Sequence, residues 1–263
     1  MPDVLNPVDG TRISYDVAGE GPPLVFLHGS ALSRVVWRGL GYLKALPGYT
    51  HIRIDARGHG RSEKPHAAPS YRPDSMVSDV LAVMDELGVE KAGIVGYSMG
   101  ARTGWQLVTS HPERALAFVA MGGTHRVQHG EISKIFFPGY LETLRAGDID
   151  AFVEGFGPGL DPNTKAAFRN NDPLALAALF EMTESGDTGI PDLLVRQVRV
   201  PALLIAGSRD QARYADSLDG ARLLPRGGFA GLEGRDHAGT LASAADVLDV
   251  MVPFLNRAIP PLR

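Results

Sequence analysis

The pentapeptide at 96–100, Gly-Tyr-Ser-Met-Gly, places Ser98 midway between two glycines. An apolar run over 91–96 leads into it, and a helix-forming stretch follows it as far as Pro112. A serine in a sharp strand-to-helix turn is pushed above the edge of the sheet. The backbone of such a turn closes only if the residues two positions away lack bulky side chains. We therefore predict that Ser98 is a nucleophile.

A serine hydroxyl needs a base to take its proton, and an imidazole with an ordinary pKa of about 6.5 suits that task. Of the eight histidines, His237 is favoured because it follows the last predicted strand, on the same rim as Ser98. Asp210, just past the strand predicted at 201–207, fits the acid that orients the imidazole and gives the chain order Ser, Asp, His. A helix cap or turn aspartate is the alternative for Asp210. Asp236 is too close in sequence to His237 to reach around its ring.

Attack on a carbonyl creates an oxyanion, which needs two preorganised N–H donors. We expect one donor from the backbone of Met99, at the start of the helix after the serine. The other is expected from the backbone of Ser30, in the loop after the strand that ends at His28.

The elements that must position these residues alternate along the chain. The segment 4–18 predicts an antiparallel edge pair, because Asp9-Gly10 favours a tight hairpin turn. Apolar runs then alternate with helical segments, which indicates a mostly parallel sheet covered by helices on both faces. Ligands in such sheets bind beyond the carboxyl ends of the strands. The further strands are expected at 23–28, 50–55, 91–96, 114–121, 201–207 and 228–233.

The strand-helix alternation stops over 124–195, where helical patches are separated by Gly and Pro. We interpret this stretch as an inserted lid. A set of ordinary surface helices is the alternative.

Composition narrows the functional classes. The formal net charge of −4 gives no indication of a nucleic-acid or membrane partner, and the absence of cysteine excludes a thiol nucleophile in this chain. The first thirty residues lack a basic stretch followed by a sustained apolar run, so we expect a cytoplasmic protein.

Taken together, these motifs resemble the α/β-hydrolase superfamily over nearly the whole chain. The matching segments are His28-Gly29, 55–62, 96–100, Asp210 and His237. The resemblance implies an eight-stranded, mostly parallel α/β sheet with helices on both faces and a helical lid after the sixth strand. The core domain would be 1–123 with 196–263, and the lid would be 124–195. The 55–62 segment is similar to a loop that is structural in most members, so His59 is not expected to be catalytic.

Within the superfamily, the chain looks like the branch of small esterases, lactonases and carbon-carbon bond hydrolases. Haloalkane dehalogenases and epoxide hydrolases resemble it but carry aspartate where this chain has Ser98. The expected pocket lies between Ser98 and the lid, and its candidate wall residues are Ser30, Leu32, Trp37, Tyr97, Met99, His125 and Phe156. Three arginines, Arg34, Arg102 and Arg126, could neutralise a substrate carboxylate, although an exposed arginine is the commoner outcome.

The leading functional hypothesis is hydrolysis of a small carboxylic ester or lactone through an acyl-enzyme, which needs no metal and no organic cofactor. The same triad could instead cleave a carbon-carbon bond or act as a cofactor-free perhydrolase. A ligand receptor or signalling partner on the hydrolase shell is the hypothesis from another class. The expected partner is a small molecule, and the protein is expected to be a monomer or homodimer.

Overall fold

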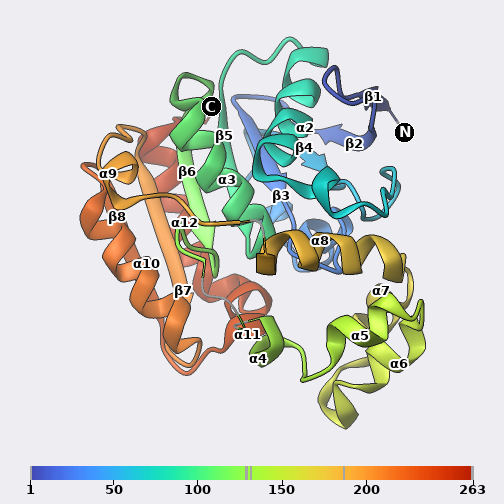
Figure 1. Cartoon of the computed structure of the whole chain (residues 1–263). Coiled ribbons are helices and arrows are strands. Elements are labelled where there is room, and N and C mark those ends of the chain that lie inside the picture. Colours follow the sequence, from blue (N-terminus) through green and yellow to red (C-terminus); the bar gives the residue numbers. More distant parts are fainter. Residues whose placement is uncertain (1, 128–129, 131, 186, 262–263) are drawn as a thin grey trace.

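A computed structural model describes residues 2–127, 130, 132–185 and 187–261. Within these residues, eight strands form one sheet in the order β1-β2-β4-β3-β5-β6-β7-β8 (Figure 1). The strands are β1 (Asp3–Leu5), β2 (Arg12–Ala18), β3 (Pro23–Leu27), β4 (Thr50–Ile54), β5 (Ala92–Tyr97), β6 (Ala115–Met121), β7 (Ala202–Gly207) and β8 (Gly227–Leu232).

The amino-terminal edge of the sheet is antiparallel, and the remainder is parallel. β1 pairs with β2, and β2 pairs with β4, in antiparallel register. The loop 6–11 joins β1 to β2 and replaces the tight turn expected at Asp9-Gly10. Within it Gly10 has a φ of 75°, which favours glycine, and the Asp9 carboxylate accepts from the Thr11 amide at 3.0 Å. The expected edge pair and mostly parallel sheet are both confirmed.

Central strands bury both faces, which explains their continuous apolar runs. In β5, Ile94 packs on one side of the sheet and Val95 on the other. One side is covered by α2 (Pro73–Glu86), α3 (Met99–Ser110) and α10 (Gln211–Leu223). The other side is covered by α1 (Val35–Gly39) and α12 (Ala244–Ala258).

Short helices accompany these elements. The 3-10 turns are η1 (Leu43–Ala45), η2 (Ala68–Tyr71), η3 (Pro112–Arg114) and η4 (Gly157–Gly159), and α11 (His237–Ala242) follows β8. None of the helices within the described parts of the chain is both long and apolar enough to cross a lipid bilayer.

The described residues between β6 and β7 form helices and loops. The helices are α4 (Ile132–Ile135), α5 (Tyr140–Arg145), α6 (Ile149–Glu154), α7 (Pro162–Arg169), α8 (Pro173–Ser185) and α9 (Asp192–Val195). In Figure 1, α5, α6 and α7 project away from the sheet, whereas α8 lies nearer to it. An aromatic cluster holds them together, with Phe152 and Phe180 in its buried centre and Phe136 in ring contact with both.

Candidate active site

Ser98 occupies the turn between β5 and α3. Its φ of 51° lies in a region that side chains other than glycine rarely adopt. The turn is tightly packed: a Cβ at Gly96 would lie 2.4 Å from the Gly100 carbonyl oxygen, and one at Gly100 would lie 2.1 Å from the Leu27 carbonyl oxygen. These contacts explain why the pentapeptide needs glycine at both ends.

His237 and Asp210 complete a hydrogen-bonded chain with Ser98. The Ser98 Oγ lies 3.0 Å from His237 Nε2, and His237 Nδ1 lies 2.7 Å from an Asp210 carboxylate oxygen. The Ser98 hydroxyl can donate to Nε2 only if the His237 proton resides on Nδ1, and an anionic Asp210 stabilises that tautomer. The arrangement therefore suits transfer of the serine proton to the imidazole.

Asp210 sits at the N-cap position of α10, but its side chain does not cap that helix. One carboxylate oxygen contacts His237, and Arg213 donates to the other at 3.1 Å. Burial acts to raise the Asp210 pKa, but the hydrogen bond and charge of His237, together with Arg213, outweigh it and lower the pKa below its usual value. Asp210 is therefore ionised at neutral pH.

The main chain of His237 is held separately from its ring. The Tyr97 hydroxyl donates to the His237 carbonyl oxygen at 3.0 Å, and the two rings lie 5.3 Å apart. Asp236 accepts from the Gly239 amide at 2.7 Å and so caps α11. Asp236 is thus engaged elsewhere, as the sequence argument required.

The two residues predicted to donate to the oxyanion, Ser30 and Met99, line the same cavity as Ser98. Met99 is the first residue of α3, so its amide has no intrahelical partner. Ser30 lines the same cavity as Ser98, in a loop whose Gly29 approaches so closely that a Cβ there would lie 3.3 Å from Ser98 Cβ.

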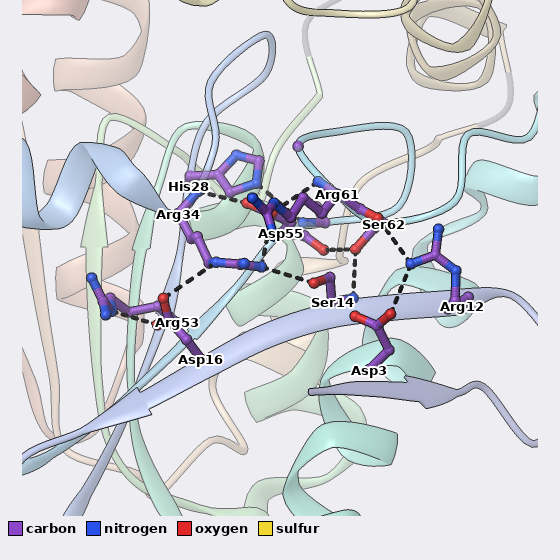
Figure 2. A network of polar contacts seen from close by, with 12 residues as sticks. Asp3, Arg12, Ser14, Asp16, His28, Arg34, Arg53, Asp55, Arg61 and Ser62 are labelled. Carbon is purple, nitrogen blue, oxygen red and sulfur yellow. Dashed lines mark hydrogen bonds and ion pairs between the residues drawn. The ribbon is translucent and has the colours of Figure 1, made fainter. Parts of the chain in front are cut away.

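A network of polar contacts joins Arg34 to Asp16 and Asp55 (Figure 2). The Asp55 carboxylate accepts from the Arg34 amide at 2.8 Å, from the Arg34 guanidinium at 2.9 Å and from the Arg61 amide at 3.0 Å. Arg34 also pairs with Asp16. Because Arg34 is only 2% exposed and lies in this network, it is not available to a substrate carboxylate.

Two fully buried histidines in the same region accept hydrogen bonds from backbone amides. His28 Nε2 lies 3.1 Å from the Ala56 amide, and His59 Nε2 lies 3.1 Å from the Ala31 amide. Burial lowers the His28 pKa, and burial followed by the nearby His28 lowers the His59 pKa to about 3. Both rings are therefore neutral and can accept. His59 does not line the cavity.

A cavity of about 840 Å³ opens above the triad. Its walls, mainly apolar, come from the sheet rim and from the inserted helices, and they include Ser98, His237, Ser30, Leu32, Tyr97, Met99, His125 and Phe156. The expectation for Trp37 is wrong: its side chain is 0% exposed and packs between Phe26 and Tyr42. Neighbouring α1 residues such as Val36 face the cavity instead, because a helix presents adjacent residues to different sides.

One end of the cavity is polar. The Arg102 guanidinium pairs with Asp187 of the inserted segment and donates to the Arg126 carbonyl oxygen at 3.1 Å. Arg126 pairs with Asp192 at 3.1 Å, and buried His125 lies 3.0 Å from Asp192 through Nε2. Both arginines are thus ion-paired within the protein.

Sequence reasoning missed two groups that touch the site. Arg213 follows Asp210 by three residues, a helical spacing that could have been recognised. Asn171, between α7 and α8, donates to the Ala31 carbonyl oxygen at 2.8 Å. No local sequence pattern identifies a contact between residues 140 positions apart.

A family model described as the alpha/beta hydrolase fold matches residues 22–186. The chain belongs to this family. The α/β-hydrolase assignment agrees with the strand order and with the serine turn described above.

Known relatives cover most of the chain. A fluoroacetate dehalogenase from Burkholderia sp is 31% identical over 232 residues, which are 76% of each chain. The solved structure of an N-acyl homoserine lactone degrading enzyme matches with a TM-score of 0.76 and 27% identity, covering 96% of this chain and all of that one. The enol-lactonase from Burkholderia xenovorans LB400 shares the fold, with a TM-score of 0.81 at 23% identity over 97% of this chain and 100% of its own.

Proposed function

We propose that this α/β-hydrolase is a serine hydrolase that cleaves a small carboxylic ester or lactone through an acyl-enzyme. The observation that carries the proposal is the hydrogen-bonded chain from Ser98 through His237 to Asp210, at the wall of a mainly apolar cavity. The base lies within hydrogen-bonding distance of both the nucleophile and the orienting acid, one at each ring nitrogen, as this chemistry requires.

In the first half of the reaction, Ser98 Oγ attacks the substrate carbonyl carbon while His237 Nε2 takes the hydroxyl proton. The oxyanion of the tetrahedral intermediate accepts from the Ser30 and Met99 amides. The carbon-oxygen bond to the leaving alcohol then breaks, and His237 returns the proton to that alcohol. In a lactone, the alcohol stays attached to the acyl group.

In the second half, water attacks the acyl-Ser98 carbonyl and gives its proton to His237. As the second tetrahedral intermediate collapses, the bond to Ser98 Oγ breaks, His237 returns the proton to that oxygen, and the carboxylic acid is released. Asp210 remains ionised throughout and stabilises the imidazolium, consistent with its lowered pKa.

The substrate class is argued from the residue types around Ser98. Apolar walls such as Leu32 and Phe156 favour an uncharged acyl group. Similarity to a lactone-degrading enzyme supports this class. The similarity to a fluoroacetate dehalogenase does not redirect the proposal, because this chain carries Ser98 at the position where the superfamily resemblance implies aspartate in haloalkane dehalogenases and epoxide hydrolases.

We also propose that residues 124–195 act as a lid on a core formed by 1–123 and 196–263. Support comes from the cavity, whose walls include Ser98 of the core together with Phe136, Leu179 and Phe180 of the inserted segment. Side chains in these helices would then set the acyl length that the site accepts.

Turnover of p-nitrophenyl acetate, butyrate and octanoate, with a lactone panel followed by acid release, tests the proposal. Wild type should hydrolyse members of these panels, and Ser98→Ala should lower kcat by up to ~10⁶. Ser110→Ala, at the far end of α3, serves as a matched control and should behave as wild type. A wild type inert to every ester and lactone, or an equally active Ser98→Ala, would overturn it.

A further inference from the structure

Ala31, one residue after the proposed oxyanion donor Ser30, has a φ of 60°. This left-handed conformation is unfavourable for a residue with a Cβ, so the surrounding contacts must hold it in place. Ala31 is completely buried, and both of its backbone polar groups bind side chains from distant parts of the chain.

The two contacts come from residues far apart in the chain. The Ala31 amide donates to His59 Nε2 at 3.1 Å, and the Ala31 carbonyl oxygen accepts from Asn171 Nδ2 at 2.8 Å. His59 is itself fixed, since its Nδ1 lies 3.0 Å from the Arg57 carbonyl oxygen. Asn171 is 8% exposed and belongs to the inserted segment.

These contacts bear on the direction of the Ser30 amide because peptide units are planar. The plane containing the Ser30 N–H also contains the Gly29 carbonyl, whose oxygen lies 2.8 Å from His28 Nδ1. His59 holds the next plane through the Ala31 amide, and Asn171 holds the one after that. Three consecutive peptide planes are therefore held by buried side chains.

We propose that Asn171, acting with His59, is a positioning residue that keeps the Ser30 amide directed at the oxyanion and thereby couples the inserted segment to catalysis. This inference rests on the proposed function. Asn171 Nδ2 also lies 3.0 Å from the Ala167 carbonyl oxygen and 3.1 Å from that of Phe168, at the end of α7. The same amide group thus joins α7 to the oxyanion loop.

A comparison of esters with matched thionoesters tests this role. Sulfur is a weaker hydrogen-bond acceptor than oxygen, so a thionoester gains little from the oxyanion donors, while it uses the same Ser98, His237 and pocket. The ratio of kcat/KM for ester to that for thionoester therefore reports on oxyanion stabilisation. A general loss of packing or of lid stability would slow both substrates alike and leave the ratio unchanged.

Two variants, Asn171→Ala and the nearly isosteric Asn171→Asp, remove the donor. The matched control is Asn170→Ala, because Asn170 is the adjacent residue and is exposed. Since loss of one oxyanion donor costs ~10²–10³ in kcat, we expect misalignment to lower the ratio at least about tenfold in both Asn171 variants. The Asn170 variant should keep the wild-type ratio.

The outcomes separate the two proposals. Absence of Ser98-dependent ester turnover in wild type would defeat the proposed function itself. If wild type is active but a folded Asn171 variant keeps the wild-type ratio, the positioning role is wrong. Asn171→Asp preserves side-chain volume, so it provides the result if the alanine variant does not fold.

Discussion

At the scale of single residues, Asp210 lies at a helix N-cap position, but its side chain does not cap the helix. It stands where α10 needs a cap, yet its two carboxylate oxygens contact His237 and Arg213. The cost of leaving the helix uncapped is modest, about 0.5–2 kcal/mol, whereas an imidazole in the wrong tautomer cannot accept the serine proton.

Replacement of Asp210 with asparagine should therefore impair catalysis much more than stability. The amide can hold the imidazole with its proton on Nε2, so we expect kcat to fall ~10⁴-fold. Ester turnover measures the effect, and Asp249→Asn, at an exposed position on α12, is the control. An Asp210→Asn enzyme with more than a tenth of wild-type kcat would contradict the role assigned to this carboxylate.

Much of the site was predictable at this scale because its chemistry dictates residue types at strand ends. Ser98, Asp210 and His237 each follow a strand, and parallel strands end at one rim. Trp37 and Asn171 could not be placed this way. The direction of Trp37 depends on the rotation of α1 against the sheet, and the Asn171 contact depends on how the inserted helices fold back.

At the scale of elements, the close packing at the junction between β5 and α3 positions the nucleophile. Gly100 lies on the first turn of α3, and its missing side chain allows the helix to approach the end of β3. A Cβ there would lie 2.1 Å from the Leu27 carbonyl oxygen and 2.8 Å from that of His28, both of which are backbone atoms.

Gly100→Ala should consequently destabilise the fold, although alanine usually favours helices by ~1 kcal/mol over glycine. We expect a loss of several kcal/mol in the free energy of unfolding, because the backbone must shift. The matched control is Gly39→Ala in α1, where a Cβ meets nothing within 4 Å. Urea unfolding compares the two variants, and a Gly100→Ala protein as stable as wild type would refute the packing argument.

Elements with clear periodicity were predictable, and those without it were missed. The strands and helix α3 lie close to their expected positions. No helix was predicted at the position of α10, because the buried face of this helix forms no apolar stripe. That face consists of Asp216, Ser217, Gly220 and Ala221. Close approach of a small-residue face to the sheet stabilises this helix, and sequence periodicity does not reveal such contacts.

At the scale of the whole molecule, buried neutral histidines link folding to pH. Burial, the largest cause, lowers the His59 pKa from 6.5 to about 3. Between these values, the unfolded chain binds a proton that the folded protein does not. The free energy of unfolding therefore rises with pH across this window. On acidification it falls by about 1.4 kcal/mol per pH unit for such a group.

Urea unfolding at pH 7, 6 and 5 should show this loss in wild type. His59→Gln should be less stable at pH 7 but should lose less stability on acidification, because the group that titrates only in the unfolded chain is gone. His111→Gln, at a side chain that is 43% exposed, should keep the wild-type slope. Equal slopes for wild type and His59→Gln would show that His59 does not contribute this proton linkage.

Covalent labelling of the nucleophile tests the central claim most directly. A fluorophosphonate transfers its phosphonyl group to an activated serine and releases fluoride, and intact mass followed by peptide mapping locates the adduct. Wild type should gain one phosphonyl group on Ser98, and Ser98→Ala should gain none. An unlabelled wild type, or an adduct confined to another residue, would contradict the assignment of Ser98, His237 and Asp210 as a working triad.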